Sequence, residues 1–270
     1  MFVLHDQGVN RLRPDVQNLV PVDGIVLGPG EGERLDDRIV VKIERPEISV
    51  NEVTAGPEFV GPGPHFHKDH VDAFYVLEGE LEFINGTETL RAGPGTTVAV
   101  PPGIVHGFTN PGPGRARYLN IHAPDAGFIE YIRHAVGDGV KVEWDNYDVD
   151  EAYGPAEAIV AGPDGGERLK RELLENMIRA DLSELSLFEM TFDERWEGVD
   201  PHSHDDHVDS FYVLEGEVEF LMDGETVRVG KGTYVAAPPH VVHGFRPVGP
   251  ARSFNLHAPD AGFAGRARGR

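Results

Sequence analysis

The fold is decided by the stretch HFHKDHVD at residues 65–72, which the chain repeats as HSHDDHVD at residues 202–209. A later histidine follows each stretch, His106 in the first copy and His243 in the second. The two leading histidines, the aspartate and the late histidine all recur at an offset of 137 residues. Because chance would not keep these spacings together, the sequence predicts two copies of one structural unit.

Other segments extend the repeat over most of the chain. The heptapeptide FYVLEGE at 74–80 returns at 211–217, and HAPDAGF at 122–128 returns at 257–263. Offsets between 134 and 137 place the insertions in loops, where they are tolerated. We therefore predict two domains, 1–145 and 146–270, joined within the acidic stretch 138–154.

Composition excludes several classes of partner. The formal net charge is −22, so binding to nucleic acid or to an anionic membrane surface is not expected. No apolar run approaches the length of a membrane span, and residues 1–13 do not resemble a secretory signal. The chain has no cysteine, hence neither a disulfide framework nor a thiolate ligand. These features together fit a cytoplasmic protein.

Short apolar runs separated by glycine and proline are typical of an all-β protein. A turn is expected at 78–80, a hairpin at Asn85-Gly86, and helices at 127–135 and, more weakly, 166–177. The predicted strands of the first copy are 75–77, 81–84, 96–100 and 118–122.

The repeated histidines have the spacing of metal ligands. Alternate residues of a strand share a face, so His65 and His67 point the same way. Asp72 and His106 from other strands would complete a set of three nitrogens and one oxygen, at about 2.0–2.2 Å from an ion. The second predicted set consists of His202, His204, Asp209 and His243.

These spacings closely resemble the motifs of the cupin family. The first motif is represented by His65, His67, Asp72 and Gly79, although neither Gly61 nor Gly63 occupies its strict leading position. The second motif is matched at every fixed position by Gly95, Pro101, Gly103, His106 and Asn110. The second copy has Gly216, Gly232 and Pro238 but departs at His240 and Pro247. The resemblance implies two tandem cupin barrels of the jelly-roll, double-stranded β-helix type.

Both copies also carry aspartate where cupins usually carry glutamate. Asp72 and Asp209 either bind the ion directly or are replaced as ligands by His70 and His207, which lie close by. The departures at His240 and Pro247 favour the N-terminal site for activity.

Residues around the ligands offer two alternatives. His122 and His257 share strand faces with Asn120 and Asn255, so they could support the ligands or hydrogen-bond to Asp125 and Asp260.

On the opposite strand face, a contact between the two barrels is expected from Tyr75, Leu77, Tyr212 and Leu214. A homodimer is also possible.

The donor set suits a divalent transition metal (Fe, Mn, Ni, Co or Zn), with up to two ions per chain. Resemblance to quercetinase-like cupins implies a mononuclear dioxygenase that combines O₂ with a small aromatic or enolic substrate. A barrel interior without an obvious Arg or Lys argues against oxalate and phosphosugars. The general base would be Asp72 (Asp209 in the second copy) or Glu78. Two alternatives are a non-redox metalloenzyme (a lyase, isomerase, decarboxylase or amidohydrolase) and a non-catalytic small-molecule-binding cupin.

Overall fold

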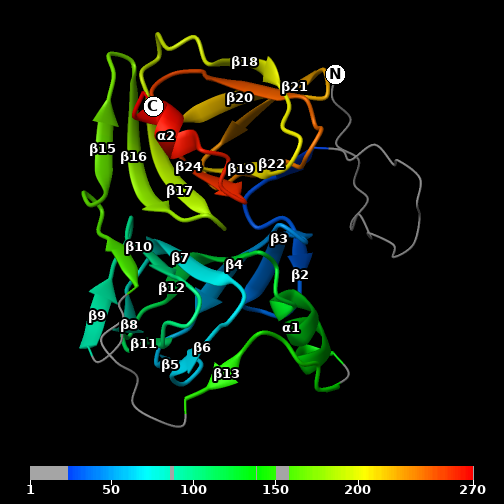
Figure 1. Cartoon of the computed structure of the whole chain (residues 1–270), viewed down its shortest axis with the longest axis vertical. Helices are drawn as coiled ribbons and strands as arrows, with labels where there is room; N and C mark the ends of the chain where they lie inside the picture. The colour runs from blue at the N-terminus through cyan, green and yellow to red at the C-terminus, as the bar shows by residue number, and fades with distance from the viewer. Residues whose placement is uncertain (1–23, 86–87, 138, 150–157, 270) are drawn as a thin grey trace.

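The computed structural model describes residues 24–85, 88–137, 139–149 and 158–269. These residues form two antiparallel β-barrels, as the sequence predicts, together with two helices (Figure 1). The N-terminal barrel is coloured mainly blue to green in Figure 1, and the C-terminal barrel mainly yellow-green to red.

The N-terminal barrel is built from two sheets. Its seven-stranded sheet contains, in order, β14 (Ile159–Ala161), β10 (Thr97–Val100), β7 (Val71–Glu78), β12 (Ala116–Ala123), β4 (Ile48–Ala55), β3 (Ile39–Arg45) and β2 (Glu33–Arg34). Its smaller sheet contains β13 (Tyr147–Asp148), β6 (His65–Phe66), β11 (His106–Asn110), β8 (Leu81–Asn85) and β9 (Glu88–Ala92), with β5 (Phe59–Val60) also paired to β11.

The C-terminal barrel repeats this plan. Its seven-stranded sheet contains β1 (Ile25–Leu27), β22 (Tyr234–Ala237), β19 (Val208–Glu215), β24 (Ala251–Ala258), β17 (Ser186–Phe192), β16 (Leu174–Asp181) and β15 (Glu167–Lys170). Its smaller sheet contains β18 (Val199–His202), β23 (His243–Pro247), β20 (Glu217–Met222) and β21 (Glu225–Gly230).

Three short strands cross the predicted boundary between residues 145 and 146. The N-terminal strand β1 pairs with β22 of the C-terminal barrel, and β14 pairs with β10 of the N-terminal barrel. In addition, β13 pairs with β6. Each barrel thus includes a strand from the other half of the chain, and the division at 145/146 stays a prediction.

The two seven-stranded sheets pack against each other and bury the largest apolar cluster between the barrels. Tyr75 stacks on Phe254 with ring centroids 4.2 Å apart. Tyr212 and Leu214 are buried in the same cluster, with Leu77 against its edge. The predicted contact between the barrels is confirmed.

A buried carboxylate from each barrel receives a tyrosine from the other. The Tyr75 hydroxyl donates to Glu189 over 3.1 Å, and the Tyr212 hydroxyl donates to Glu52 over 3.4 Å. A buried cation neutralises each carboxylate, Lys42 beside Glu52 at 3.2 Å and Arg179 beside Glu189 at 2.6 Å. Because buried charges are tolerated only when paired, these cations serve the interface and are not available inside the barrels.

Of the two predicted helices, the structure confirms one and contradicts the other. The helix expected at 127–135 is α1 (Phe128–Val136), and a second short helix is α2 (Phe263–Ala267). The helix expected at 166–177 is wrong, because this segment forms the hairpin strands β15 and β16. The expected hairpin strands β8 and β9 pair, but Gly86 lies outside the described residues.

The turn at 78–80 explains why a glycine stands at residue 79. Gly79 has φ +71°, and a Cβ there would collide with the carbonyl oxygen of Arg115. Gly216 repeats this arrangement with φ +72°. Only glycine fits both constraints.

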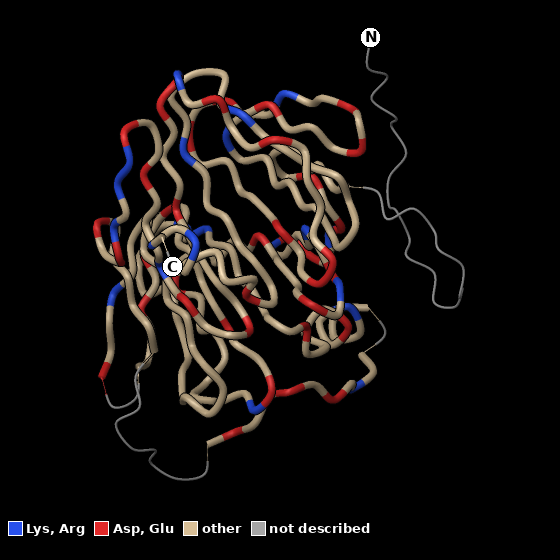
Figure 2. Tube along the Cα trace, turned by 45° about the horizontal axis from the view of Figure 1, so that its top comes forward, with Lys and Arg blue, Asp and Glu red and all other residues tan. Residues whose placement is uncertain are grey.

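Charged residues lie along both barrels, and the acidic ones are in excess (Figure 2). Among the described residues, no helix has the length and apolarity needed to cross a membrane.

Candidate metal centres

The structure brings the four predicted N-terminal donors together inside the barrel. His65 on β6 lies directly opposite His106 on β11, while Asp72 reaches in from β7 of the larger sheet. The donor atoms of His65, His67, Asp72 and His106 all lie within 4.8 Å of one another, and all four residues are buried. Asp72 Oδ2 is 3.2 Å from His106 Nε2 and 3.7 Å from His67 Nε2. Ligands about 2.0–2.2 Å from one ion have similar separations.

The orientation of the imidazoles also fits an ion. The Nδ1 atoms of His65, His67 and His106 face the carbonyl oxygens of Gly63, Asp145 and Ile104, at 2.8, 2.5 and 3.0 Å. An N–H that donates to a carbonyl fixes the proton on Nδ1 and leaves the Nε2 lone pair for a metal. His67 Nε2 is buried without a hydrogen-bond partner among the described residues. A transition metal would satisfy this atom.

Asn120 on β12 holds the carboxylate of Asp72 in place. Its Nδ2 donates to Asp72 Oδ1 over 2.6 Å, while its Oδ1 accepts from His122 Nε2 over 3.0 Å. His122 therefore supports the ligand through Asn120. The alternative bond to Asp125 is wrong, because His122 Nδ1 has no hydrogen-bond partner among the described residues. In the second copy, Asp260 accepts from Ser186, and His257 repeats the bond to Asn255.

Electrostatics favour the metal-binding protonation states of His65 and Asp72. Burial and the neighbouring His106 lower the pKa of His65 to about 4. Burial alone would raise the pKa of Asp72, but the imidazoles of His122, His106 and His67 around the carboxylate bring it well below its usual value. Neutral imidazoles and an ionised carboxylate are the metal-binding forms.

The same depressed pKa makes Asp72 a weak general base at neutral pH. The other base considered, Glu78, lies at the far end of β7 and forms an ion pair with Arg117. This position and this ion pair do not support a role for Glu78 in abstracting a proton at the metal centre.

Sequence reasoning missed the segment that covers the N-terminal centre, residues 144–148, which we call the strap. The Asp145 carboxylate accepts from His70 Nδ1 over 2.7 Å and from the backbone N–H groups of Lys68 and Asp69. Trp144 stacks on His122 at 6.0 Å with nearly parallel rings. The only sequence signal was that this acidic, aromatic stretch follows α1 without a repeated partner.

His70 faces the strap and lies outside the four-donor group. It forms a separate compact group with His67 and Asp145. The arrangement favours Asp72 over His70 as the fourth donor, while ligation itself stays a prediction.

The C-terminal centre repeats the donor geometry. His202 on β18 lies opposite His243 on β23, and these two join His204 and Asp209 in a second group within 4.8 Å. Asp209 Oδ2 is 3.3 Å from His243 Nε2 and 3.8 Å from His204 Nε2. Asn255 Nδ2 donates to Asp209 Oδ1 over 2.7 Å, as Asn120 does in the first copy.

Exposure distinguishes this second centre from the first. The side chain of His204 is 17% exposed, whereas that of its counterpart His67 is 2% exposed. His207 contacts the solvent-exposed Asp206 at 3.1 Å instead of a covering segment. The C-terminal donors are therefore more open to solvent.

The two departures from the second motif do not touch the donors. His240 has φ +71° and so adopts the backbone conformation of its counterpart Gly103, with φ +82°. Asn110, which Pro247 replaces, uses its amide to hold the turn at 112–114 and the end of β4. Both differences are structural and leave the second donor set intact.

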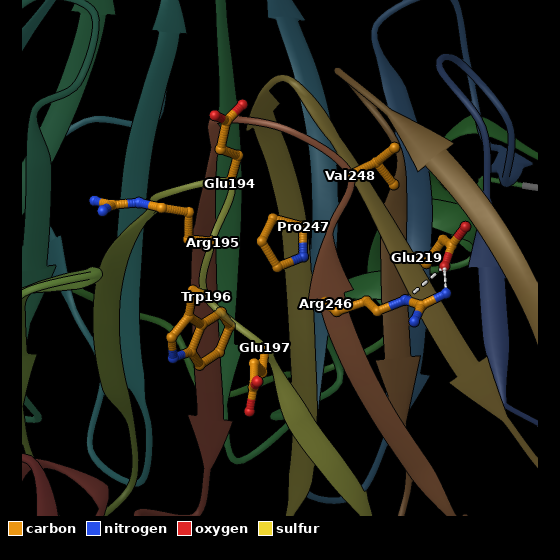
Figure 3. A pocket seen from close by; sticks show the side chains of 8 residues that line it. All are labelled: Glu194, Arg195, Trp196, Glu197, Glu219, Arg246, Pro247 and Val248. Atoms are coloured by element: carbon orange, nitrogen blue, oxygen red, sulfur yellow. Dashed lines mark hydrogen bonds and ion pairs between the residues drawn. The ribbon is translucent and has the colours of Figure 1, made fainter.

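A surface groove of about 410 Å³ lies on the C-terminal barrel (Figure 3). Arg246 crosses it to form an ion pair with Glu219. Pro247 in its wall is at the opposite end of β23 from His243, so the groove is separate from the donor set. The remaining lining residues are Glu194, Arg195, Trp196, Glu197 and Val248.

Comparison with known families agrees with this architecture. The sequence model described as "Cupin domain" matches residues 51–122 and again residues 188–256. These matches cover about half of the chain and include a donor set in each barrel. The protein belongs to the cupin family and is a bicupin.

One curated relative is quercetin 2,3-dioxygenase of Bacillus subtilis (strain 168), 25% identical over 218 residues. The match covers 67% of this chain and 64% of the Bacillus enzyme, so the chain spans less than two thirds of that relative's length.

Solved structures show the same fold at low identity. Protein Ylba from E. coli has a TM-score of 0.63 and 14% identity, covering 88% of this chain and 92% of that one. The putative glyoxylate induced protein from Pseudomonas aeruginosa has a TM-score of 0.62 and 17% identity, and the match covers 93% of this chain and 92% of that one. Salicylate 1,2-dioxygenase from Pseudaminobacter salicylatoxidans has a TM-score of 0.59 and 14% identity, and the match covers 82% of this chain and 74% of that one.

Proposed function

We propose that this bicupin is a metal-dependent dioxygenase acting on a small aromatic or enolic compound, with a divalent transition metal (Fe, Mn, Ni, Co or Zn) in each barrel. The observation that carries the proposal is the pair of converging His₃Asp donor sets. Similarity to quercetin 2,3-dioxygenase supports the reaction type.

The bound ion would supply open coordination positions where an organic oxygen and O₂ can meet. The chain's own residues do the rest. Asn120 and Asn255 keep the aspartates turned toward the histidines. Phe74 and Phe108, 5.0 Å apart inside the N-terminal barrel, give a substrate ring an apolar wall.

Elemental analysis of the untagged protein tests the metal sites first. We expect up to two equivalents of metal in the wild type and one fewer in His67→Ala and in His204→Ala. Absence of metal after anaerobic reconstitution would remove the enzymatic proposal altogether.

Oxygen uptake then tests the reaction. Metal-loaded wild-type protein should consume O₂ with an electron-rich enol or phenol, and the double variant His67→Ala/His204→Ala should not. Turnover of a metabolite without oxygen uptake would instead indicate a non-redox metalloenzyme, and ligand binding without turnover a non-catalytic cupin. A cytoplasmic location is part of the proposal.

A further inference from the structure

Asn51 is a buried amide that the fold leaves without a hydrogen-bond partner. The side chain is 0% exposed, and neither Nδ2 nor Oδ1 has a hydrogen-bond partner among the described residues. Burying an unsatisfied amide costs roughly 1–3 kcal/mol in proteins. Such a group therefore requires an explanation.

The strand register places this amide inside the N-terminal barrel. Along β4, Val50 and Glu52 face the other barrel, in the apolar cluster and the ion-pair network between the barrels. Since strand residues alternate, Asn51 faces the barrel interior together with Val53.

Asn51 also lies next to the metal centre. It is the direct cross-strand partner of Asn120, whose amide holds Asp72. Directly opposed residues have Cβ atoms roughly 4.5–5.5 Å apart. The Asn120 amide is already engaged with Asp72 and His122, which leaves Asn51 unsatisfied.

The C-terminal barrel has no amide at the corresponding place. There Phe188 is the cross-strand partner of Asn255, and it is fully buried against Phe263. A polar residue is therefore not required by the fold at this position. Its presence in only one barrel points to a ligand.

We propose that Asn51 is a specificity-determining residue, whose amide hydrogen-bonds an uncharged polar substituent of the ligand at the N-terminal centre, and that Phe188 makes the C-terminal centre select an apolar group. The inference rests on the metal sites of the proposed function but does not depend on O₂ chemistry. The buried Lys42 is paired with Glu52, so an uncharged substituent fits better than a carboxylate.

Two pyranone chelators that differ by one hydroxyl group test this assignment. Kojic acid carries a hydroxymethyl group where its deoxy analogue allomaltol carries a methyl group. The dissociation constants are measured by titrating Co²⁺-loaded protein and following its visible absorption. His204→Ala isolates the N-terminal centre, and His67→Ala isolates the C-terminal centre.

We expect the N-terminal centre to bind kojic acid about tenfold more tightly than allomaltol, because the lost hydrogen bond leaves a buried amide unsatisfied. Asn51→Leu should abolish this preference without changing metal content. The C-terminal centre should prefer allomaltol, and Phe188→Asn should shift it toward kojic acid.

Thermal unfolding of the metal-loaded, ligand-free variants separates recognition from structure. Asn51→Leu should be at least as stable as the wild type, because it removes an unsatisfied amide from the core. Marked destabilisation would assign Asn51 a structural role and overturn the proposal. Equal affinity for the two pyranones in wild type and Asn51→Leu, or no binding of either, would also overturn it. Oxygen uptake in the wild type would survive each of these outcomes if the proposed function holds.

Discussion

The two metal centres of this bicupin share their donors but differ in what covers them. In each, three histidines face one aspartate, and an asparagine two residues before a buried histidine holds the carboxylate. The strap at 144–148 covers only the N-terminal centre, where all four donors are buried, whereas His202 and His204 are partly exposed. A repeated domain can therefore keep the same metal donors while the access of solvent to them changes.

The two centres differ most in the hydrogen bonds of the loop between the second histidine and the aspartate, residues 68–70 in the first copy and 205–207 in the second. Asp145 has a side chain only 9% exposed and ties His70 to the backbone of Lys68 and Asp69. Asp206 is 85% exposed and forms an ion pair with His207. The N-terminal loop is thus held by the buried carboxylate of Asp145, whereas the ion pairs of the C-terminal loop, His207 with Asp206 and His240 with Asp205, use exposed carboxylates.

The largest expected effect follows from Asp145→Asn. Loss of the charge weakens several hydrogen bonds to a carboxylate, so we expect the free energy of unfolding to fall by ~1.5–3 kcal/mol. The matched variant Asp206→Asn should change it by less than ~0.5 kcal/mol, because that carboxylate is exposed. Urea denaturation at equal metal content measures both. Equal losses would mean that the strap does not stabilise the N-terminal loop.

The second prediction concerns the asparagine that orients the aspartate in both centres. Asn120→Ala and Asn255→Ala should each weaken metal binding at their own centre by roughly 10–100-fold, because the aspartate loses the amide that orients it. Competition with a chromophoric chelator measures the dissociation constants. Asn110→Ala is the control, since that amide holds a turn and should lower stability without weakening metal binding. An effect in only one barrel would show that the donor sets are not equivalent.

The donor sets could be predicted from sequence because their information is local. Strand alternation predicts that His65 and His67 face the same ion, although β6 ends at Phe66 and His67 lies just beyond it. The second copy, at an offset of 137, supports the same interpretation. The contact through Tyr75 and Tyr212 follows from the same alternation, on the opposite face.

The features that the sequence did not predict depend on contacts between residues far apart in the chain. Asp145 contacts His67 across 78 residues, and β1 joins the barrel formed by the other half of the chain. The segment 166–177 is rich in good helix formers, yet Leu174 and Met177 belong to a strand that pairs with β17. Local propensity is weak against a sheet partner of this length.

The smallest effect, and the most direct probe of access, is the rate at which a chelator removes each metal. Excess EDTA should take the ion from the C-terminal centre about tenfold faster than from the N-terminal one, equivalent to ~1.4 kcal/mol for opening the strap. His67→Ala and His204→Ala supply the single-centre proteins, and release is followed by the loss of Co²⁺ absorption. Equal rates in the two proteins would mean that the strap does not limit access.

Removing Trp144 should erase this difference. Trp144 packs 5.3 Å from His67 and stacks on His122, so Trp144→Ala opens the N-terminal centre while leaving its four donors in place. Release from that centre should rise about tenfold, to the rate of the C-terminal one. Trp196→Ala is the matched control, because Trp196 stacks on Phe192 beside the surface groove and should leave both rates unchanged. If Trp144→Ala leaves release slow, burial of the donors by the barrel itself, and not the strap, sets the exchange rate.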